Sequence, residues 1–376
     1  MSGKKSLWDK FGKLNFSVFF SLMQFFSMAA ARRFLYIGLE DRSIYEDSFS
    51  DRVLQTTLFG KTFPNPLGIA AGFDTSFRYA DELMEFGFGF EEFGTFTRQP
   101  NGFPERLRYS KGQKAILVNA PYFRNKGITF AQRALINRRH LPHIAGISLA
   151  SNLEVTDENR QTNLIFEQIE KELVEMVQLT APYCDYITLN LSHPYLTISN
   201  LIVNVSLLEI VIVHLKQVIQ KIAPIANPRL LVKVPIDITA EQVSLLAETL
   251  MRAGADGVEV GGYVNAKNAV KKLLGSHALG FIAGKPLQDA STQTVEQFYT
   301  ITKGQLPIIA SGGIFSGDDA FAKICAGASL VQIHSAILFE GPGIGNKINK
   351  RLAYLLKTKG FKDVSEAVGS KFRRTI

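Results

Sequence analysis

Two glycine-rich turns near the C-terminus have the residue types that bind an anion. In the first, residues 311–313 (Ser-Gly-Gly) interrupt an apolar run, and Ser316 stands where a helix would begin. In the second, an apolar run ends at His334 and Ser335, which we expect to begin the last helix. Amides at a helix N-terminus favour an anion by ~0.3–1 kcal/mol per charge. Together the turns predict a phosphate site, although a single glycine pair is as typical of an ordinary loop.

Eight short apolar runs would position these turns. The runs are residues 67–72, 90–97, 144–149, 186–191, 230–234, 257–261, 307–311 and 329–333. Amphipathic stretches such as 163–179 and 240–253 separate them, and this alternation predicts a single parallel (β/α)8 TIM barrel rather than a doubly wound sheet. Residues 56–63 are expected to form a hairpin that closes the bottom of the barrel. Catalytic residues in such a barrel lie at the carboxyl ends of the strands.

With residues 283–287 (Ala-Gly-Lys-Pro-Leu) and 291–294 (Ser-Thr-Gln-Thr), the two turns resemble the FMN-phosphate site of the quinone-dependent dihydroorotate dehydrogenases. The resemblance extends from about Asn65 to Arg374. It implies an enzyme of pyrimidine biosynthesis that oxidises dihydroorotate to orotate with FMN and passes electrons to a quinone. It also places several residues at FMN-binding positions: Ala71, Thr95, Asn190, Lys233, Gly284, Gly313 and Ser335. Neighbouring residues complete the expected cofactor site: Ala70, Gly72, Asn119, Gly261, Gly312 and His334.

Three of these residues suggest specific contacts with a flavin. Lys233 could place positive charge beside the flavin ring and stabilise its anionic reduced form. The alternative, a solvated lysine, is disfavoured by its apolar neighbours at 231, 232 and 234. Asn190 and Asn119 could hydrogen-bond both the flavin and a planar substrate, or they could be ordinary turn asparagines.

The expected substrate site departs from the family's pattern. After the fourth strand the family has Asn, an apolar residue and Ser-Ser-Pro-Asn-Thr, whose second serine removes a proton from dihydroorotate. Here His193 replaces that serine, and Tyr195 replaces a substrate-binding asparagine. Thr75 replaces a lysine, and residues 261–263 (Gly-Gly-Tyr) replace Thr-Asn-Thr. The substrate-binding residues assigned on this basis are Thr75, Asn119, Phe123, Tyr195 and Tyr263.

His193 is the predicted catalytic base, because an imidazole has a pKa near neutrality. The alternative is an ordinary polar histidine in a loop beside Pro194. Each buried polar group of a ligand that stays unpaired costs ~1–3 kcal/mol. The replacements would therefore weaken orotate binding unless Arg124, Tyr195 or Tyr263 supplies new partners.

The leading hypothesis is an FMN-dependent oxidoreductase with dihydroorotate as its implied substrate. Two alternatives stay open: a divergent paralogue that acts on another substrate, and a non-catalytic flavin-binding protein. A barrel that binds some other phosphorylated ligand without flavin is disfavoured, because Lys233, Thr95 and Asn190 would then lack a shared purpose.

The N-terminal segment is expected to associate with a membrane. A basic stretch at 1–13 precedes an apolar stretch at 16–31, which is shorter than the ~20 residues of a transmembrane helix. We expect residues 1–40 to form helices that lie on the membrane and residues 41–376 to form the barrel. A signal peptide is the alternative. The resemblance implies that the segment forms the quinone tunnel. We expect it on the cytoplasmic face of a bacterial cell membrane, because the two cysteines are expected to be reduced.

Composition limits the other partners. The chain has 376 residues, 46% of them hydrophobic, and a net charge of +8. No nucleic-acid-binding motif accompanies that charge, so an anionic membrane surface fits it better than RNA or DNA. Cys184 and Cys325 lack the spacing of metal ligands and are expected to be reduced residues of the core. No metal site is predicted.

Overall fold

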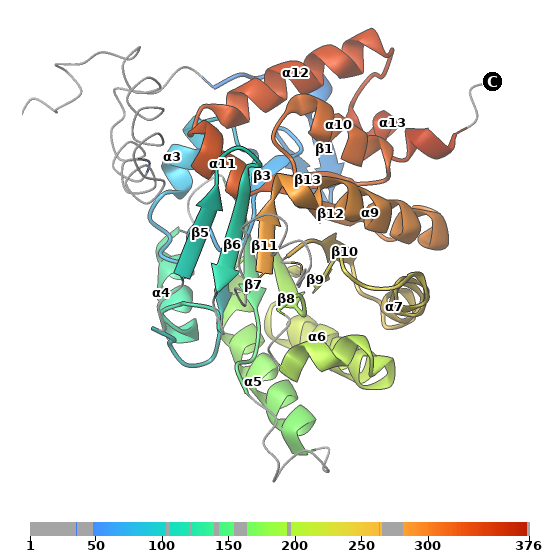
Figure 1. Ribbon diagram of the computed structural model, residues 1–376. Coiled ribbons are helices and arrows are strands. Elements are labelled where there is room, and N and C mark those ends of the chain that lie inside the picture. Colours follow the sequence, from blue (N-terminus) through green and yellow to red (C-terminus); the bar gives the residue numbers. More distant parts are fainter. Residues whose placement is uncertain are drawn as a thin grey trace, which may run out of the picture.

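Eight parallel strands close into a barrel, in the order β10-β12-β13-β3-β4-β7-β8-β9, with helices around it (Figure 1). The computed structural model describes Leu35 and residues 48–102, 106–119, 122–138, 143–153, 164–193, 197–262, 264 and 281–373. The barrel strands are β3 (Leu67–Ile69), β4 (Phe90–Phe96), β7 (Ile144–Leu149), β8 (Tyr186–Asn190), β9 (Arg229–Val234), β10 (Gly257–Val260), β12 (Ile308–Ser311) and β13 (Leu330–Ile333). Each predicted run overlaps one of these strands, so the predicted (β/α)8 barrel is confirmed.

The bottom of the barrel is closed by a hairpin, as predicted. Strands β1 (Thr56–Leu58) and β2 (Lys61–Phe63) pair antiparallel. Leu58 and Phe59 of this hairpin pack against a separate buried cluster inside the barrel. The cluster consists of Phe63, Phe90, Ile144, Tyr186, Leu231, Ile309 and Leu330. This apolar cluster fills the bottom of the barrel, which leaves the opposite end for polar residues.

The described helices are α3 (Ala80–Glu85), α4 (Ile128–Arg138), α5 (Leu164–Thr180), α6 (Val205–Ile222), α7 (Ala240–Arg252), α9 (Gln288–Thr302), α10 (Gly317–Cys325), α11 (Ser335–Glu340), α12 (Ile344–Thr358) and α13 (Val364–Ala367). Helices α5 and α7 confirm two predicted amphipathic stretches. Thr239 and Gln242 form a capping box at the start of α7. The expectation that His334 and Ser335 begin the last helix is wrong, because Gly341 ends α11 at a φ of 80° and α12 and α13 follow.

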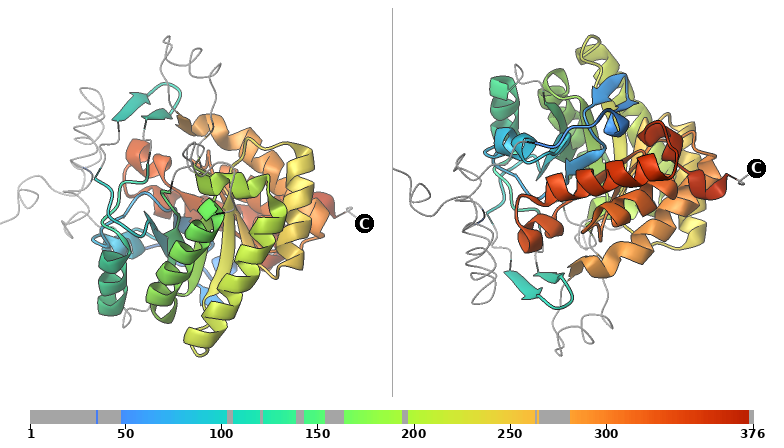
Figure 2. Two further views of the ribbon diagram at one scale, coloured as in Figure 1. Left: turned by 90° about the horizontal axis from the view of Figure 1, so that it is seen from below. Right: turned by 90° about the horizontal axis from the view of Figure 1, so that it is seen from above.

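A three-stranded antiparallel sheet lies outside the barrel and was not predicted. It contains β5 (Arg106–Ser110), β6 (Ala115–Asn119) and β11 (Phe281–Gly284), with β6 in the centre. Figure 2 shows the β5–β6 hairpin standing out beyond the helices. Asn119, predicted to begin a loop, is instead the last residue of β6. Strand β11 brings Gly284 to the carboxyl end of the barrel.

The predictions for the N-terminal segment lie outside the described residues, apart from Leu35, which is buried. The boundary at residue 40 stays a prediction. Within the described part of the chain, no helix has both the length and the apolar character needed to cross a membrane. Cys184 is a buried free thiol just before β8, and Cys325 is a half-buried free thiol at the end of α10.

Candidate active site

A cavity opens at the carboxyl ends of the barrel strands and gathers most of the predicted cofactor residues. Ala70 follows β3, Asn190 ends β8, Gly312 follows β12 and His334 follows β13. The predicted residues that line this one cavity are Ala70, Ala71, Gly72, Thr95, Phe123, Asn190, Lys233, Gly284, Gly312, Gly313, His334 and Ser335. The barrel therefore brings residues from distant parts of the chain to one site, as its topology predicts.

A glycine loop between β12 and α10 lines the cavity. Gly312 and Gly313 have φ values of 99° and 77°, a backbone region that favours glycine. A Cβ on Gly313 would lie 2.4 Å from the Cα of Gln288, so a side chain has no room there. Neither glycine amide donates a hydrogen bond to any described residue. Ser316 caps α10 by accepting from the amide of Asp319 at 3.2 Å, which confirms its predicted position.

A buried hydrogen-bond network contributes to the wall of the cavity. The Asn190 amide donates to Thr95 Oγ1 at 2.8 Å, and Thr95 and Ser148 share a hydrogen bond of 2.9 Å. The amide and hydroxyl of Ser192 both donate to Asn190 Oδ1, at 2.9 and 2.7 Å. These bonds fix the Asn190 side chain in one orientation. Ser192 lines the cavity and was missed, although its place two residues after Asn190 was a signal.

Lys233 supplies a buried positive charge beside the cavity. Its Nζ lies 2.5 Å from Glu259 Oε1, and the residue is only 5% exposed, which excludes a solvated lysine. Burial lowers the pKa of Lys233, but the Glu259 and Glu92 carboxylates outweigh this effect and raise the pKa above its usual value. Burial, followed by the nearby Glu259 carboxylate, raises the pKa of Glu92 well above its usual range. Lys233 therefore stays protonated.

The acidic partners of Lys233 were not predicted. Glu92 and Glu259 lie on β4 and β10 and are fully buried. Glu92 also accepts a hydrogen bond from Thr188 Oγ1 at 3.0 Å. Gly261, expected to contact the cofactor, lies next to this cluster rather than on the cavity wall, and a Cβ there would meet Ser311 Oγ at 1.9 Å. Its lack of a side chain makes room for Ser311.

The structure brings fewer of the predicted substrate-binding residues than of the predicted cofactor-binding residues to the cavity. Phe123 lines the cavity, whereas Thr75 does not. His193 is 2% exposed and does not line the cavity either. Its ring packs edge-on against Phe123 and Phe281, with centroids 4.7 and 6.0 Å away. Tyr195 and Tyr263 lie outside the described residues, as does the side chain of Asn119.

Comparisons with known proteins agree with this geometry. Residues 53–356 match the family model described as dihydroorotate dehydrogenase. The dihydroorotate dehydrogenase (quinone) of Rhodospirillum rubrum is 35% identical over 346 residues, 91% of this chain and 90% of the relative. The mitochondrial dihydroorotate dehydrogenase (quinone) of Mus musculus is 32% identical over 355 residues, covering 92% and 86%. The crystal structure of Eimeria tenella DHODH in complex with ferulenol matches with a TM-score of 0.80 and 26% identity, covering 90% of this chain and 94% of that one. The chain therefore belongs to the dihydroorotate dehydrogenase family, in its quinone-dependent class.

Proposed function

We propose that the protein is an FMN-dependent dehydrogenase that oxidises the CH–CH bond of dihydroorotate to give orotate and passes the electrons to a quinone. One observation carries the proposal: the glycine loop and the cation of Lys233 belong to the same cavity. A flavin that bears a phosphate needs an anion site at one end and benefits from a cation near its ring at the other. The names of the relatives supply the substrate and the acceptor.

The described residues fit FMN. The amides of Gly312 and Gly313, which donate to no described residue, would hold the phosphate together with Gly284, His334 and Ser335, which line the same cavity. Thr95, Asn190 and Lys233 would contact the ring, and the small residues Ala70, Ala71 and Gly72 would leave room for it. Bound there, FMN would supply a ring that accepts a hydride. Lys233 would stabilise the negative charge that this transfer places on the ring.

For proton removal we propose His193, which stands at the position of the family's catalytic serine. Its ring packs against Phe123, which lines the cavity, so the imidazole lies next to the cavity wall. Ser192 is a second candidate, because it lines the cavity and its hydroxyl is held by Asn190. Phe123, Thr75, Asn119, Tyr195 and Tyr263 complete the proposed substrate site.

Two variants test these assignments. Loss of a general base lowers the rate by ~10²–10⁴-fold. His193→Ala should therefore slow orotate formation by about that factor while the protein retains its FMN. Ser192→Ala removes the hydroxyl of the second candidate and should slow the reaction much less. A larger loss in Ser192→Ala than in His193→Ala would assign the base to Ser192.

The quinone acceptor connects the proposal to the membrane. Quinones of respiratory chains are lipid-soluble, so an enzyme that reduces them has to reach the bilayer surface. We propose that residues 1–40 make this contact, helped by the net charge of +8, and that the barrel lies on the cytoplasmic face. The two alternatives, another substrate or a flavin-binding protein without turnover, would both leave the flavin oxidised in the presence of dihydroorotate.

A further inference from the structure

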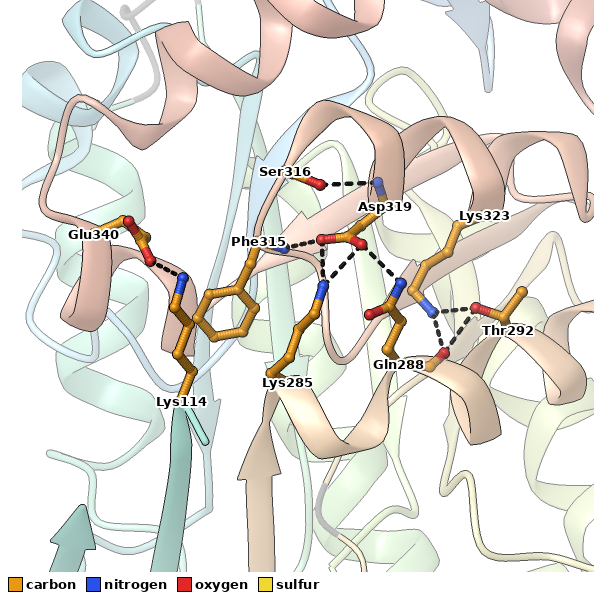
Figure 3. Close-up of polar contacts among 9 residues, drawn as sticks. All are labelled: Lys114, Lys285, Gln288, Thr292, Phe315, Ser316, Asp319, Lys323 and Glu340. Carbon is orange, nitrogen blue, oxygen red and sulfur yellow. Dashed lines mark hydrogen bonds and ion pairs between the residues drawn. The ribbon is translucent and has the colours of Figure 1, made fainter. Parts of the chain in front are cut away.

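Lys323 on α10 is a buried lysine that no part of the proposed reaction uses. It is 0% exposed, and no described carboxylate lies within ion-pair distance of it. Its Nζ donates to Ser291 Oγ at 2.9 Å, to Thr292 Oγ1 at 3.1 Å and to the carbonyl of Gln288 at 3.3 Å. Figure 3 shows Lys323 reaching from α10 to the first turn of α9. Burying an ammonium group without a counter-ion costs free energy, which suggests that Lys323 has a function.

Ser291 connects Lys323 to the glycine loop. A lysine only donates hydrogen bonds, so Ser291 Oγ must accept from Lys323 and its own hydrogen points elsewhere. That hydrogen goes to the carbonyl of Ser311, with an oxygen–oxygen distance of 2.5 Å. Gly312 follows directly, and a Cβ there would lie 3.3 Å from the Cβ of Ser291. Lys323 therefore fixes the backbone at the point where the glycine loop begins.

Asp319, also on α10, fixes the other end of the loop. It accepts from the amide of Phe315 at 2.9 Å and from Gln288 Nε2 at 2.7 Å. Lys285 Nζ pairs with the same carboxylate at 2.7 Å (Figure 3). Because Lys285 already neutralises Asp319, Lys323 contributes an additional positive charge behind the loop.

The charge of Lys323 depends on pH near neutrality. Burial lowers its pKa to about 7, although the Asp319 and Asp289 carboxylates act in the opposite direction and Lys285 adds to the lowering. An anion bound in the loop would favour the protonated form of Lys323. Anion binding would then be accompanied by proton uptake above about pH 7.

We propose that Lys323 is a positioning residue for the phosphate site: through Ser291 it holds the glycine loop in its binding conformation, and its positive charge strengthens the binding of a phosphate dianion. The inference rests on the proposed function, because the loop is assigned there to the FMN phosphate. It predicts that loss of Lys323 weakens the binding of FMN but not the binding of riboflavin, the same flavin without phosphate.

The test compares the affinity of the apoprotein for FMN and for riboflavin by fluorescence quenching between pH 7 and pH 9. In the wild type, FMN affinity should fall by about tenfold over this range as Lys323 loses its proton. Lys323→Met should bind FMN about tenfold more weakly at pH 7, without that pH dependence, and should bind riboflavin normally. Lys350→Met removes the same charge from the exposed face of α12 and should behave as the wild type.

A second variant separates the two roles and serves if Lys323→Met does not fold. Ser291→Ala keeps the lysine but removes its link to Ser311, so FMN affinity should fall at every pH while its pH dependence stays. Wild-type FMN affinity and pH dependence in both variants, or an equal loss for riboflavin, would overturn the inference. A wild-type protein that binds neither flavin would contradict the proposed function instead. Thermal stabilisation by inorganic phosphate, weaker in Lys323→Met, would then still report on the loop.

Discussion

Lys233 Nζ lies 2.5 Å from Glu259 Oε1 inside the barrel, and the side chains are only 6% and 0% exposed. Removing one partner of a buried ion pair leaves an uncompensated charge and costs about 3 kcal/mol or more. Glu259→Gln should therefore lower the free energy of unfolding by about that amount in urea denaturation. Glu209→Gln breaks the exposed ion pair with Arg252 and should change the free energy of unfolding little. Equal losses in the two variants would contradict the account of this cluster.

A side chain at Gly313 should fill the space beside the glycine loop and cause the protein to lose its cofactor. Gly313→Val adds a side chain where Gln288 leaves no room and forces a positive φ on a branched residue. The purified variant should retain at least about tenfold less FMN, measured by extraction and absorbance. Gly343→Val is the control, since a Cβ at that position meets nothing within 4 Å. Normal FMN content in Gly313→Val would refute the assignment of the loop.

Glu91 predicts an unusual pH dependence of stability. It is 2% exposed, and neither of its carboxylate oxygens has a hydrogen-bond partner in the described chain. Burial, with smaller contributions from neighbouring acids such as Asp74, raises its pKa well above 4.5. The folded state thus keeps a proton that the unfolded chain releases, so stability falls as pH rises above about 4.5.

Glu91→Gln should remove this loss of stability at high pH. The variant should exceed the wild type in free energy of unfolding by about 1 kcal/mol or more at pH 8, with little difference near pH 4.5. Urea denaturation at the two pH values measures the change. A difference that is the same at both would show that Glu91 ionises normally.

The N-terminal segment should determine membrane association and leave the cofactor in place. A protein without residues 1–33 is expected to stay in solution when mixed with anionic vesicles, while the full chain sediments with them. Both should contain FMN at the same ratio. Loss of FMN on truncation would show that the segment belongs to the barrel.

Much of the fold could be predicted because barrel strands are buried on both faces and read as short apolar runs. The runs at 186–191 and 329–333 contain β8 and β13. The outer sheet gave no such signal. Strand β5 carries Arg106 and Arg108, and β11 pairs with β6 across a long separation in sequence, which no local pattern reveals.

The cofactor side of the site followed from small residues at strand ends, whereas its buried charges did not. Glu92 and Glu259 were not predicted because a local pattern does not show which strand residues point into the barrel. Lys323 is typical of the polar face of an amphipathic helix, yet α9 covers it completely. His193 was assigned from its position in a motif, and its packing against Phe123 depends on contacts that form only in the folded chain.

The central claim is that this cavity oxidises dihydroorotate. Its most direct test is the anaerobic mixing of the purified, FMN-loaded protein with dihydroorotate, followed by stopped-flow absorbance at the oxidised flavin band. We predict rapid bleaching with formation of orotate, and reoxidation of the flavin when a quinone is added. A flavin that stays oxidised, with FMN shown to be bound, would contradict the claim, and bleaching by a different reductant would then identify another substrate.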